Sequence, residues 1–485
     1  MTTPVSHDLA VAGGGVLLIA AVLIVVGRAL ARRGAGPLVT RKIPHALCGV
    51  FAALAAFQLS HGAVVAGVLA AATVALTIIV ERGLIPVPGV FDGTRSRDYG
   101  LVGFAAGALI AVLAFWPDRI AIAAGVLVLG LADAGAALIG DRYGRHRVEA
   151  GGGVRSLEGS LGFVVIAFAV SWAFCRFGLE LNTFMAVSVS LFVAITTAAV
   201  ELLVLPAADN LLITPWVALL LHVARDLSTD DALRWLAALA FGCAIVPFML
   251  RMRWLDLPGA LGGGLIAGVA VGLGGWPWII PAAVFFSLTS LLTAYRRPTR
   301  ATGMRSLSQV AVNAGLPVLV PVIGYAFTGD PLWYAVSIGG IAAGIADSWA
   351  SEIGRFSAHE PLSVRTWTRV PKGTSGAVSP LGSGATVLGA LAVGAFGALF
   401  GGVLMVPVGL AAGILGSLVD TAIGASMQAR FSCATCGATV EENLHCGAPT
   451  RASTGWRWMG NDAVNACANL AGMVVGLAVF GLFGS

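Results

Sequence analysis

Long apolar stretches recur along almost the whole chain, and they leave few folds open to it. Residues 11–30, for example, contain Arg28 as their single charge, and about 20 apolar residues in a helix are enough to cross a bilayer. Only 11% of the 485 residues are charged, whereas ordinary soluble domains carry about 25%. We therefore predict an all-α polytopic integral membrane protein with about 14–16 transmembrane helices in a lipid bilayer.

The basic residues predict how these helices are threaded through the membrane. With the N-terminus outside, all but four of the 29 Lys and Arg residues lie on the cytoplasmic side, the exceptions being Arg119, Arg176, Arg225 and Arg234. Basic residues are enriched in cytoplasmic loops, so we predict a protein of the cell membrane whose active-site loops are cytoplasmic. The net charge of +5 is attributed to this orientation. The sequence indicates no nucleic-acid partner, and it leaves the oligomeric state open.

A short polar segment at residues 221–235 separates two halves of similar length, which we predict as domains 1–225 and 226–485. Three features keep the same order in both halves. The first is a basic residue four positions before a polar one, Arg41–His45 and Arg305–Gln309. The second is an acid in an apolar helix, Asp133 and Asp347, and the third is another acid late in each half, Glu201 and Asp420. These matches predict two distantly related repeats of about eight helices each.

The acid in the apolar helix begins a stripe of small residues in each half. The two stripes are Asp133–Ala136–Gly140 and Asp347–Ala350–Gly354. Positions i, i+3 and i+7 share one face of a helix. Each acid is therefore predicted to share its helix face with a groove lined by small residues. Ionisable residues inside a membrane are costly and usually functional. A polar contact that only packs two helices together is the other interpretation.

The loops that follow the stripes, 141–162 and 365–384, are basic and rich in glycine and hydroxyl side chains. Positive side chains, together with backbone N–H groups at a helix start, bind polyphosphates. A neighbouring acid can hold Mg²⁺ between the phosphates. The pairing of stripe and loop favours a nucleotide site over an ordinary positive-inside loop. The sequence contains no GxxxxGK[ST] motif, so a P-loop enzyme is excluded.

Five motifs occur in order between about residues 30 and 220 of the first half: RKIPH (41–45), SRDYG (96–100), DAGAALIGDRYG (133–144), RSLEGS (155–160) and ELLVLPAADN (201–210). Together they resemble the dolichol kinase and phytol kinase family, which is distantly similar to CDP-diacylglycerol synthases. The resemblance implies CTP-dependent phosphorylation of a long isoprenoid alcohol at the cytoplasmic membrane face. That family often has Lys where Arg155 stands, which keeps the charge but changes how a phosphate is bound.

The second half, from about residue 255 to 485, contains GMRSLSQVAVNAG (303–315), GIADSWASEIGR (344–355), RVPKGTSGAVS (369–379), GSLVDTAIGASMQ (416–428), HCG (445–447) and GNDAVN (460–465). These motifs resemble the phytyl-phosphate kinase family of prokaryotes and plastids. The resemblance implies addition of a second phosphate to an isoprenyl monophosphate. Both halves on one chain imply consecutive steps, from alcohol to monophosphate to diphosphate.

Phosphoryl transfer requires mainly positioning and charge neutralisation, and the first-half residues can be assigned on this basis. Asp133 is assigned to Mg²⁺, and Arg155 and Ser156 to the nucleotide phosphates. His45 or Glu201 is a candidate base for the alcohol proton, with His45 as a plain interfacial histidine equally open. The remaining first-half candidates are Arg41, Lys42, Gly140, Gly144, Glu158, Gly159, Asp209 and Asn210.

In the second half the phosphate acceptor, an isoprenyl monophosphate, is already an anion, so a general base is less important there. This agrees with the residues at the corresponding positions, where Gln309 and Asn313 stand in place of His45 and Gly49. Asp347 and Asp420 are assigned to Mg²⁺. The other candidates, for phosphate charge and for positioning, are Arg305, Glu352, Gly354, Arg355, Arg369, Lys372, Gly373, Thr374, Ser375, Asn461, Asp462 and Asn465. Glu352 and Arg355 stand where the first half has Leu138 and Asp141, so they are predicted to set the preference for a phosphorylated acceptor.

Three of the seven cysteines cluster with a histidine in a predicted insertion, 430–457. They are Cys433 and Cys436, in a C-x2-C pair, and Cys446 beside His445. This spacing is typical of a structural Zn²⁺ site, with buried thiols or a redox-sensitive pair as the alternatives.

Two other functions remain open from the sequence alone. A cytidylyltransferase that forms a CDP-lipid would use a similar nucleotide site, and a transporter would also be built from repeated halves. The isoprenoid chain length is not encoded in any motif, since generic apolar residues would line its pocket.

Overall fold

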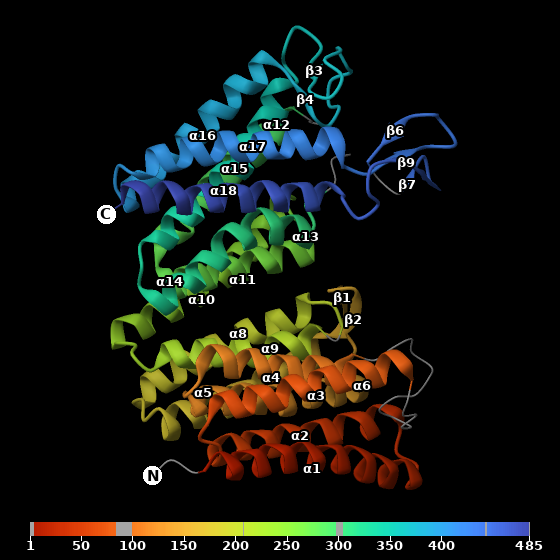
Figure 1. Ribbon diagram of the computed structural model, residues 1–485, viewed down its shortest axis with the longest axis vertical. Coiled ribbons are helices and arrows are strands. Elements are labelled where there is room, and N and C mark those ends of the chain that lie inside the picture. Colours follow the sequence, from red (N-terminus) through yellow and green to blue (C-terminus); the bar gives the residue numbers. More distant parts are fainter. Residues whose placement is uncertain (1–3, 84–98, 207, 297–303, 442–443, 485) are drawn as a thin grey trace. The chain divides into compact units, whose positions relative to one another are not determined.

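The computed structural model describes residues 4–83, 99–206, 208–296, 304–441 and 444–484 (Figure 1). Among these residues, thirteen helices are long and apolar enough to cross a membrane, and two shorter apolar helices, Gly100–Phe115 and Ala208–Ala224, accompany them. The prediction of an all-α polytopic membrane protein is confirmed. Of the motifs quoted above, residues 96–98, Ala207 and Gly303 lie outside the described residues.

The chain divides into two compact units, Met1–Leu236 and Ala237–Ser485. The helices of the first unit follow the predicted apolar runs: α1 (Val5–Arg32), α2 (Pro37–Gln58), α3 (Gly62–Arg82), α4 (Gly100–Phe115), α5 (Arg119–Val128), η1 (Leu129–Asp133), α6 (Ala134–Tyr143), α7 (Leu157–Ala173), η2 (Phe174–Gly178), α8 (Thr183–Leu203) and α9 (Ala208–Ala224). The segments η1 and η2 are π-helical. Helices α5, η1 and α6 form one continuous span, Arg119–Tyr143, which is 67% buried in its most apolar window.

A short hairpin precedes α7 in the first unit. Strands β1 (Arg147–Ala150) and β2 (Gly153–Ser156) are antiparallel, with Arg147 opposite Ser156. The two-residue turn consists of Gly151 and Gly152, whose φ angles are +57° and +75°. Tight hairpins favour turns with positive φ at both central residues, a conformation that glycine adopts readily. The basic, glycine-rich loop 141–162 therefore contains a short β-hairpin that leads directly into α7.

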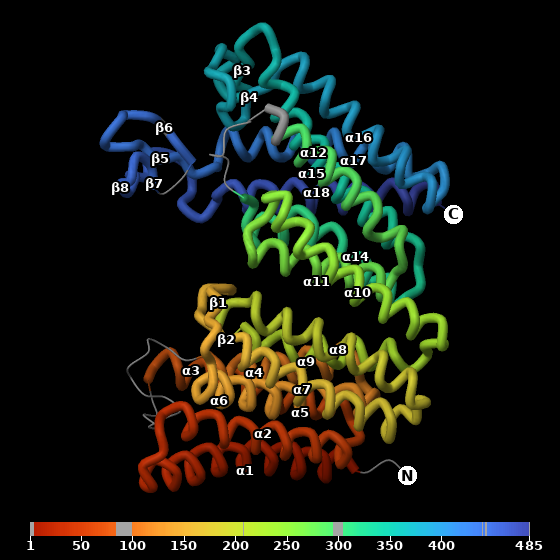
Figure 2. The backbone as a smooth tube through the Cα atoms, turned by 180° about the vertical axis from the view of Figure 1, so that it is seen from behind, coloured from red at the N-terminus to blue at the C-terminus, as the bar shows by residue number. Residues whose placement is uncertain are grey.

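The second unit is built around α15. Its helices are α10 (Thr229–Arg251, which begins in the first unit), α11 (Leu257–Gly274), η3 (Trp276–Trp278), α12 (Ile280–Arg296), α13 (Leu307–Val310), η4 (Ala311–Leu319), α14 (Val320–Thr328), α15 (Leu332–Gly354), α16 (Pro380–Gly401), α17 (Met405–Ser426) and α18 (Asn461–Phe483). Helices α16, α17 and α18 all pack on α15, and they lie side by side in both views (Figures 1 and 2). Segment η4 is π-helical.

The strands of the second unit are short. Strand β3 (Leu362–Ser363) pairs with β4 (Ala377–Val378) just before α16. Five more follow α17, namely β5 (Arg430–Ser432), β6 (Thr439–Val440), β7 (Leu444–His445), β8 (Ala448–Pro449) and β9 (Arg451–Thr454). They form a three-stranded sheet in the order β6-β5-β9 and a separate β7-β8 hairpin. This group of strands occupies the predicted insertion between α17 and α18.

Small residues let the helices of each unit approach closely, as expected for helices that pack in a membrane. A Cβ atom added at Gly49 of α2 would lie 2.8 Å from the Cα of Gly130 in η1. A Cβ atom added at Gly339 of α15 would likewise collide with the backbone of Gly472 in α18. The contact between α2 and η1 holds Asp133, the last residue of η1, close to α2.

A buried carboxylate outside the membrane-spanning helices holds the start of α5. Asp118 is 7% exposed, accepts a hydrogen bond from the backbone N–H of Ala121 at 3.0 Å, and binds the guanidinium of Arg225 and Nδ1 of His222, the latter at 2.9 Å. Burial alone would raise the pKa of Asp118, but the hydrogen bonds from Arg225, His222 and Ala121 hold that pKa below its usual value. These contacts tie the start of α5 to the end of α9.

Replacing Asp118 by Asn should destabilise the first unit, because it removes the buried negative charge that Arg225 and His222 contact. We expect a loss of about 1–3 kcal/mol in the free energy of unfolding at neutral pH, measured by thermal unfolding in detergent. A carboxyl with a lowered pKa stabilises the fold above its unfolded pKa of about 3.9 and loses that contribution as the pH falls through the folded-state value.

The difference between wild type and Asp118→Asn should therefore be constant from pH 7 to about pH 5 and shrink below about pH 4. Asp226→Asn is the control, since Asp226 is exposed beside the same arginine; it should change stability little. A difference that grows as the pH falls would contradict this role of the ionised carboxylate.

Candidate functional site

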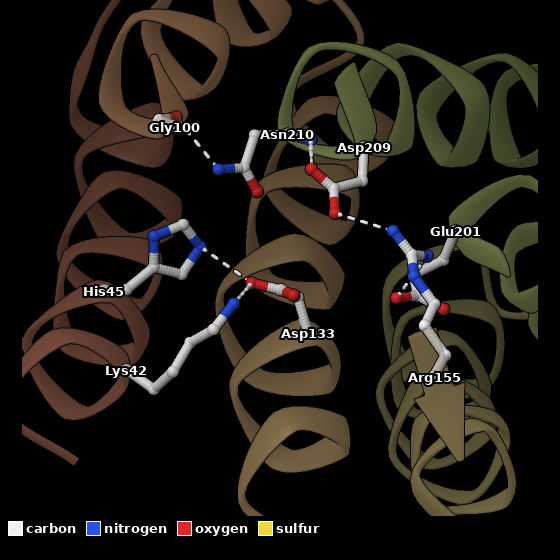
Figure 3. Close-up of polar contacts among 8 residues, drawn as sticks. All are labelled: Lys42, His45, Gly100, Asp133, Arg155, Glu201, Asp209 and Asn210. Carbon is white, nitrogen blue, oxygen red and sulfur yellow. Dashed lines mark hydrogen bonds and ion pairs between the residues drawn. The ribbon is translucent and has the colours of Figure 1, made fainter. Parts of the chain in front are cut away.

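Seven polar side chains of the first unit converge from five elements and are called here the first-unit cluster (Figure 3). They come from α2, η1, β2, α8 and the first turn of α9: Lys42, His45, Asp133, Arg155, Glu201, Asp209 and Asn210. Five of them are less than 9% exposed, namely Lys42, His45, Asp133, Glu201 and Asn210. A group of ionisable side chains buried together inside a membrane bundle is a strong indication of function.

Asp133 is the carboxylate on the α2 side of the cluster. Nζ of Lys42 lies 2.6 Å from its Oδ2, and Nε2 of His45 lies 3.6 Å from the same oxygen. Asp133 ends the π-helical segment η1, and single π-turns within α-helices are frequent at functional sites. The π-turn was not expected from the sequence, because its backbone pattern has no residue signature.

Arg155 is the cation on the opposite side of the cluster. Its Nη1 lies 2.6 Å from Oε1 of Glu201, and its Nη2 lies 3.4 Å from Oδ2 of Asp209. The β1–β2 hairpin carries Arg155 into the cluster, and the register of that hairpin determines where the guanidinium points. The arrangement therefore depends on a tight turn that lies outside the helices.

Asn210 and Asp209 fix the start of α9. Nδ2 of Asn210 donates to the backbone carbonyl of Gly100 at 2.9 Å, and its backbone N–H donates to Oδ1 of Asp209 at 2.8 Å. Asn210 thus links α9 to the first residue of α4, and it orients the carboxylate that Arg155 contacts.

The cluster borders a cavity of about 990 Å³. Most of the first-half candidates line it, namely Arg41, Lys42, His45, Asp133, Gly140, Arg155, Ser156, Gly159, Glu201, Asp209 and Asn210. Tyr99, Asp141 and Arg147 line it too. Tyr99 and Asp141 were not among the sequence candidates, whereas Arg147 belongs to the basic loop 141–162 that was predicted to bind phosphate. Arg147 faces Ser156 across the hairpin, a pairing that the sequence alone did not show.

Two of the first-half candidates do not line the cavity. Glu158 binds His146 instead, with 2.7 Å between its Oε1 and Nδ1 of the histidine and a further hydrogen bond from the backbone N–H of His146. Gly144 provides space, because a Cβ atom there would lie 2.8 Å from Oγ of Ser156. Both residues shape the junction between α6, the hairpin and α7.

That junction is a close contact between the glycine stripe and a helix start. Ser156 caps α7 by accepting a hydrogen bond from the backbone N–H of Gly159 at 3.1 Å. Gly140 lies against this cap, and a Cβ atom added there would be 2.7 Å from Oγ of Ser156. The stripe thus allows the capped start of α7, whose N–H groups favour anions, to border the cavity.

The second unit contains the same type of contact. Ser379 caps α16 by accepting from the backbone N–H of Gly382 at 3.1 Å. A Cβ atom added at Gly354 would lie 3.2 Å from the Cα of Gly382 and 3.3 Å from Oγ of Ser379. Asp347 lies two turns before Gly354 on the same helix, as Asp133 does before Gly140.

Asp347 of α15 and Asp420 of α17 are in side-chain contact with each other. The carboxylate of Glu352, further along α15, accepts a hydrogen bond from Oγ1 of Thr293 at 3.4 Å. Asn461, Asp462 and Asn465 lie in the first turns of α18, with Asn461 exposed and the other two half-buried. The structure therefore brings the two carboxyl groups of Asp347 and Asp420 together.

A smaller cavity of about 140 Å³ in the second unit is lined mainly by apolar side chains of α10, α11, α12, η4 and α15. Its polar residues include the candidates Arg305, Gln309 and Asn313. Nη1 of Arg305 donates to Oγ of Ser290 at 2.9 Å, and the guanidinium lies 4.9 Å from the ring centre of Phe286. Asp347 and Asp420 are not among the residues that line this cavity.

Asn469 is a second-unit residue that sequence reasoning missed. It is 1% exposed on α18, and its Nδ2 donates to the backbone carbonyl of Val312 at 3.0 Å and to Oδ1 of Asn313 at 3.3 Å. It thereby satisfies a carbonyl of the π-helical segment η4 and orients Asn313. An asparagine in the middle of an apolar helix was the available signal.

The loop between α15 and α16 is held mostly by its own backbone. Nζ of Lys372 donates to the carbonyl of Ser357 at 2.6 Å, Arg369 Nη1 to that of Glu360 at 3.0 Å, and Thr374 Oγ1 to that of Pro371 at 2.7 Å. Gly373 lies against the guanidinium of the exposed Arg355, and Ser375 donates to a carboxylate oxygen of Glu441. These candidates thus belong to one ordered loop.

The four cysteine and histidine candidates also come together. Donor atoms of Cys433, Cys436, His445 and Cys446 all lie within 4.8 Å of one another. All seven cysteines of the chain are free thiols.

Comparisons with known proteins place the chain among membrane proteins. The family model described as "Integral membrane protein DUF92" matches residues 240–473. An uncharacterized membrane protein of Methanocaldococcus jannaschii is 31% identical over 206 residues, which are 41% of this chain and 85% of that protein. Protein PGR of Arabidopsis thaliana is 27% identical over 42% of this chain and 82% of its own length.

A phytol kinase of a Synechocystis strain is 32% identical over 177 residues, which are 36% of this chain and 73% of that enzyme. No solved structure matches the chain significantly.

The close contact between Gly140 and Ser156 can be tested by adding one methyl group at Gly140. Gly140→Ala should push the hairpin away from α6 and cost about 1–3 kcal/mol of stability through overpacking, seen as a lower thermal unfolding midpoint in detergent. Gly67→Ala is the matched control, since Gly67 also lies inside a helix but has no heavy atom within 4 Å of an added Cβ. Gly67→Ala should leave stability unchanged or raise it slightly; equal effects of the two variants would contradict the contact.

Proposed function

The chain belongs to a family of integral membrane proteins, with a DUF92 domain in its second half, and we propose that it is a membrane kinase of isoprenoid lipids. The first unit would phosphorylate a long-chain isoprenoid alcohol to the monophosphate, and the second unit would add the second phosphate. CTP is the proposed donor for both steps. The similarity to a phytol kinase and the motifs of the two halves support this reaction class and this division of labour.

The observation that carries the proposal is the first-unit cluster on its large cavity. Basic side chains on the cavity wall, Arg41, Lys42, Arg147 and Arg155, match the charge of a triphosphate. Glycines on the same wall and the capped start of α7 leave backbone N–H groups accessible to phosphate oxygens. About 990 Å³ is the size of pocket that encloses a ligand as large as a nucleotide.

The donor atoms on this wall also fit Mg²⁺, which prefers carboxylate oxygens and phosphate oxygens to nitrogen or sulfur. Asp133 and Asp209 would hold the ion, which would neutralise phosphate charge when bound. Lys42 now pairs with Asp133 at 2.6 Å, and it can move to a phosphate oxygen as one cation replaces another beside the carboxylate. Each carboxylate of the cluster is paired with Lys42 or Arg155, which agrees with a replacement of the amino-acid cation by Mg²⁺.

The proposed first step transfers the terminal phosphoryl group of the nucleotide. The alcohol oxygen forms a bond to the γ-phosphorus, the bond from that phosphorus to the bridging β–γ oxygen breaks, and the nucleoside diphosphate leaves. The alcohol proton goes to His45 or Glu201, which both line the cavity. Arg155 stabilises the charge that spreads over the transferred group.

The proposed second step differs in its acceptor, an isoprenyl monophosphate. Arg305, Gln309 and Asn313 at the apolar cavity of the second unit would bind the anionic head, and the apolar side chains there would contact the isoprenoid chain. Asp347 and Asp420 would bind Mg²⁺. Glu352 and Arg355, which have no counterparts of the same charge in the first unit, would select a phosphorylated acceptor.

Single carboxylate replacements separate the two proposed steps. The purified chain in detergent is given phytol or geranylgeraniol with labelled CTP, and monophosphate and diphosphate products are separated by chromatography. Asp133→Asn should lower monophosphate formation by about 10²–10³-fold and leave conversion of added monophosphate unchanged. Asp347→Asn should do the reverse, so that monophosphate accumulates.

Two outcomes would overturn this scheme. Loss of both steps from either single replacement would exclude two separate sites. Release of pyrophosphate rather than CDP would identify a cytidylyltransferase. Asp330→Asn, which removes an exposed acid of the second unit, is the matched control and should leave both steps intact.

A further inference from the structure

Two hairpin turns in the insertion between α17 and α18 place four metal-binding side chains together. Cys433 and Cys436 lie in the turn between β5 and β6, and His445 and Cys446 lie at the turn between β7 and β8. Sγ of Cys436 is 3.5 Å from Nδ1 of His445, and Sγ of Cys446 is 3.3 Å from the same nitrogen. Two turns that each supply two ligands are a common design for structural zinc.

The two sulfur–nitrogen distances match those of a tetrahedral site. With Zn–S near 2.3 Å and Zn–N near 2.0–2.1 Å, tetrahedral geometry requires about 3.8 Å between two sulfurs and about 3.5 Å between sulfur and nitrogen. The two measured sulfur–nitrogen distances agree with this requirement, and all four donor atoms fall within 4.8 Å of one another. A disulfide, by contrast, would use two thiols and leave the imidazole without a role.

The backbone is shaped to present these side chains. The N–H of Gly437 donates to the carbonyl of Cys433, and the N–H of Cys433 donates to the carbonyl of Ala438, both at 2.9 Å. Gly437 and Gly447 have φ angles of +73° and +74°, and Cys446 itself has a φ of +53°. Positive φ is unfavourable for a residue with a side chain. This backbone conformation turns adjacent His445 and Cys446 toward the same point.

The strands around these turns have little else to hold them. Strands β6, β7 and β8 are two residues long each, and β9 is exposed throughout. Small hairpins of this kind are marginal without a core, a disulfide or a metal. Metal binding to such a segment contributes directly to its folding free energy.

We propose that Cys433, Cys436, His445 and Cys446 bind one structural Zn²⁺ ion, which folds the strands β5 to β9 and holds them against the loop before α16. That loop contains Ser375, which donates to Glu441 next to β6. Nε2 of Gln428 donates to the other carboxylate oxygen of Glu441 at 2.9 Å, and Nη2 of Arg430 donates to the carbonyl of Ser375 at 3.0 Å. The zinc site therefore stabilises an ordered loop of the second unit, and it stands independently of the reaction proposed above.

The first test is metal content. The full chain, purified in detergent with an affinity tag that does not bind metals, should contain one zinc per chain by elemental analysis. Cys436→Ser and His445→Ala should each lower that content at least tenfold, whereas His445→Cys should retain it, because thiolate replaces imidazole in many zinc sites. Cys243→Ser, at an exposed thiol on α10, is the control and should keep the full complement.

The second test is local folding. A strong zinc chelator added to the wild-type chain should open residues 430–454 to protease cleavage and raise their hydrogen exchange, while α17 and α18 stay protected. Added Zn²⁺ should reverse both effects in the wild type and have no effect in Cys436→Ser. Zinc content in the wild type no higher than in Cys436→Ser, or a segment equally protected with and without chelator, would overturn the proposal. Neither readout depends on kinase activity.

Discussion

Charge inside a membrane bundle has to be neutralised locally, and the first unit is arranged around this requirement. A buried carboxylate without a partner costs several kcal/mol, so Asp133, Glu201 and Asp209 each require a nearby cation. Lys42 supplies it from α2, and Arg155 supplies it from the hairpin before α7. Five separate elements must therefore be in place at once for the cluster to exist. The same pairs place cations and oxygen donors side by side on the cavity wall, which is the combination that a metal-bound polyphosphate needs.

Glycine contacts make this arrangement sterically possible. The hairpin and α7 reach the cluster because Gly140 has no side chain at the point where Ser156 caps α7. The second unit uses Gly354, Gly382 and Ser379 in the same way. In both units the acid on the stripe lies about two helical turns from the glycine that contacts the capped helix start. In the first unit, Asp133 and the start of α7 line the same cavity. This shared local geometry is the physical reason to assign related chemistry to the two units.

Much of the candidate site could be predicted from residue order. Asp133, Arg155, Glu201 and Asp209 come from segments far apart in the sequence, yet motifs indicated all four, and the structure brings them together. Arg147 was indicated only as part of the basic loop 141–162, and Tyr99 and Asn469 were missed. Arg147 reaches the cavity through the hairpin register, Tyr99 lies directly before α4, and Asn469 acts by supporting Asn313. Glu158 was selected because it belongs to a motif, but its side chain binds His146 outside the cavity.

The sequence by itself determined that this chain lies in a membrane as a bundle of helices, because the length and apolarity of its segments allow little else. It also indicated which acids lie inside the helices and which loops are basic. Only the tertiary structure decided which charges pair, since pairing depends on helix rotation, on the π-turns at Asp133 and Asn313, and on the two-glycine turn of the first hairpin. Those features are backbone geometries stabilised by contacts between distant segments, and residue spacing along one segment carries no record of them.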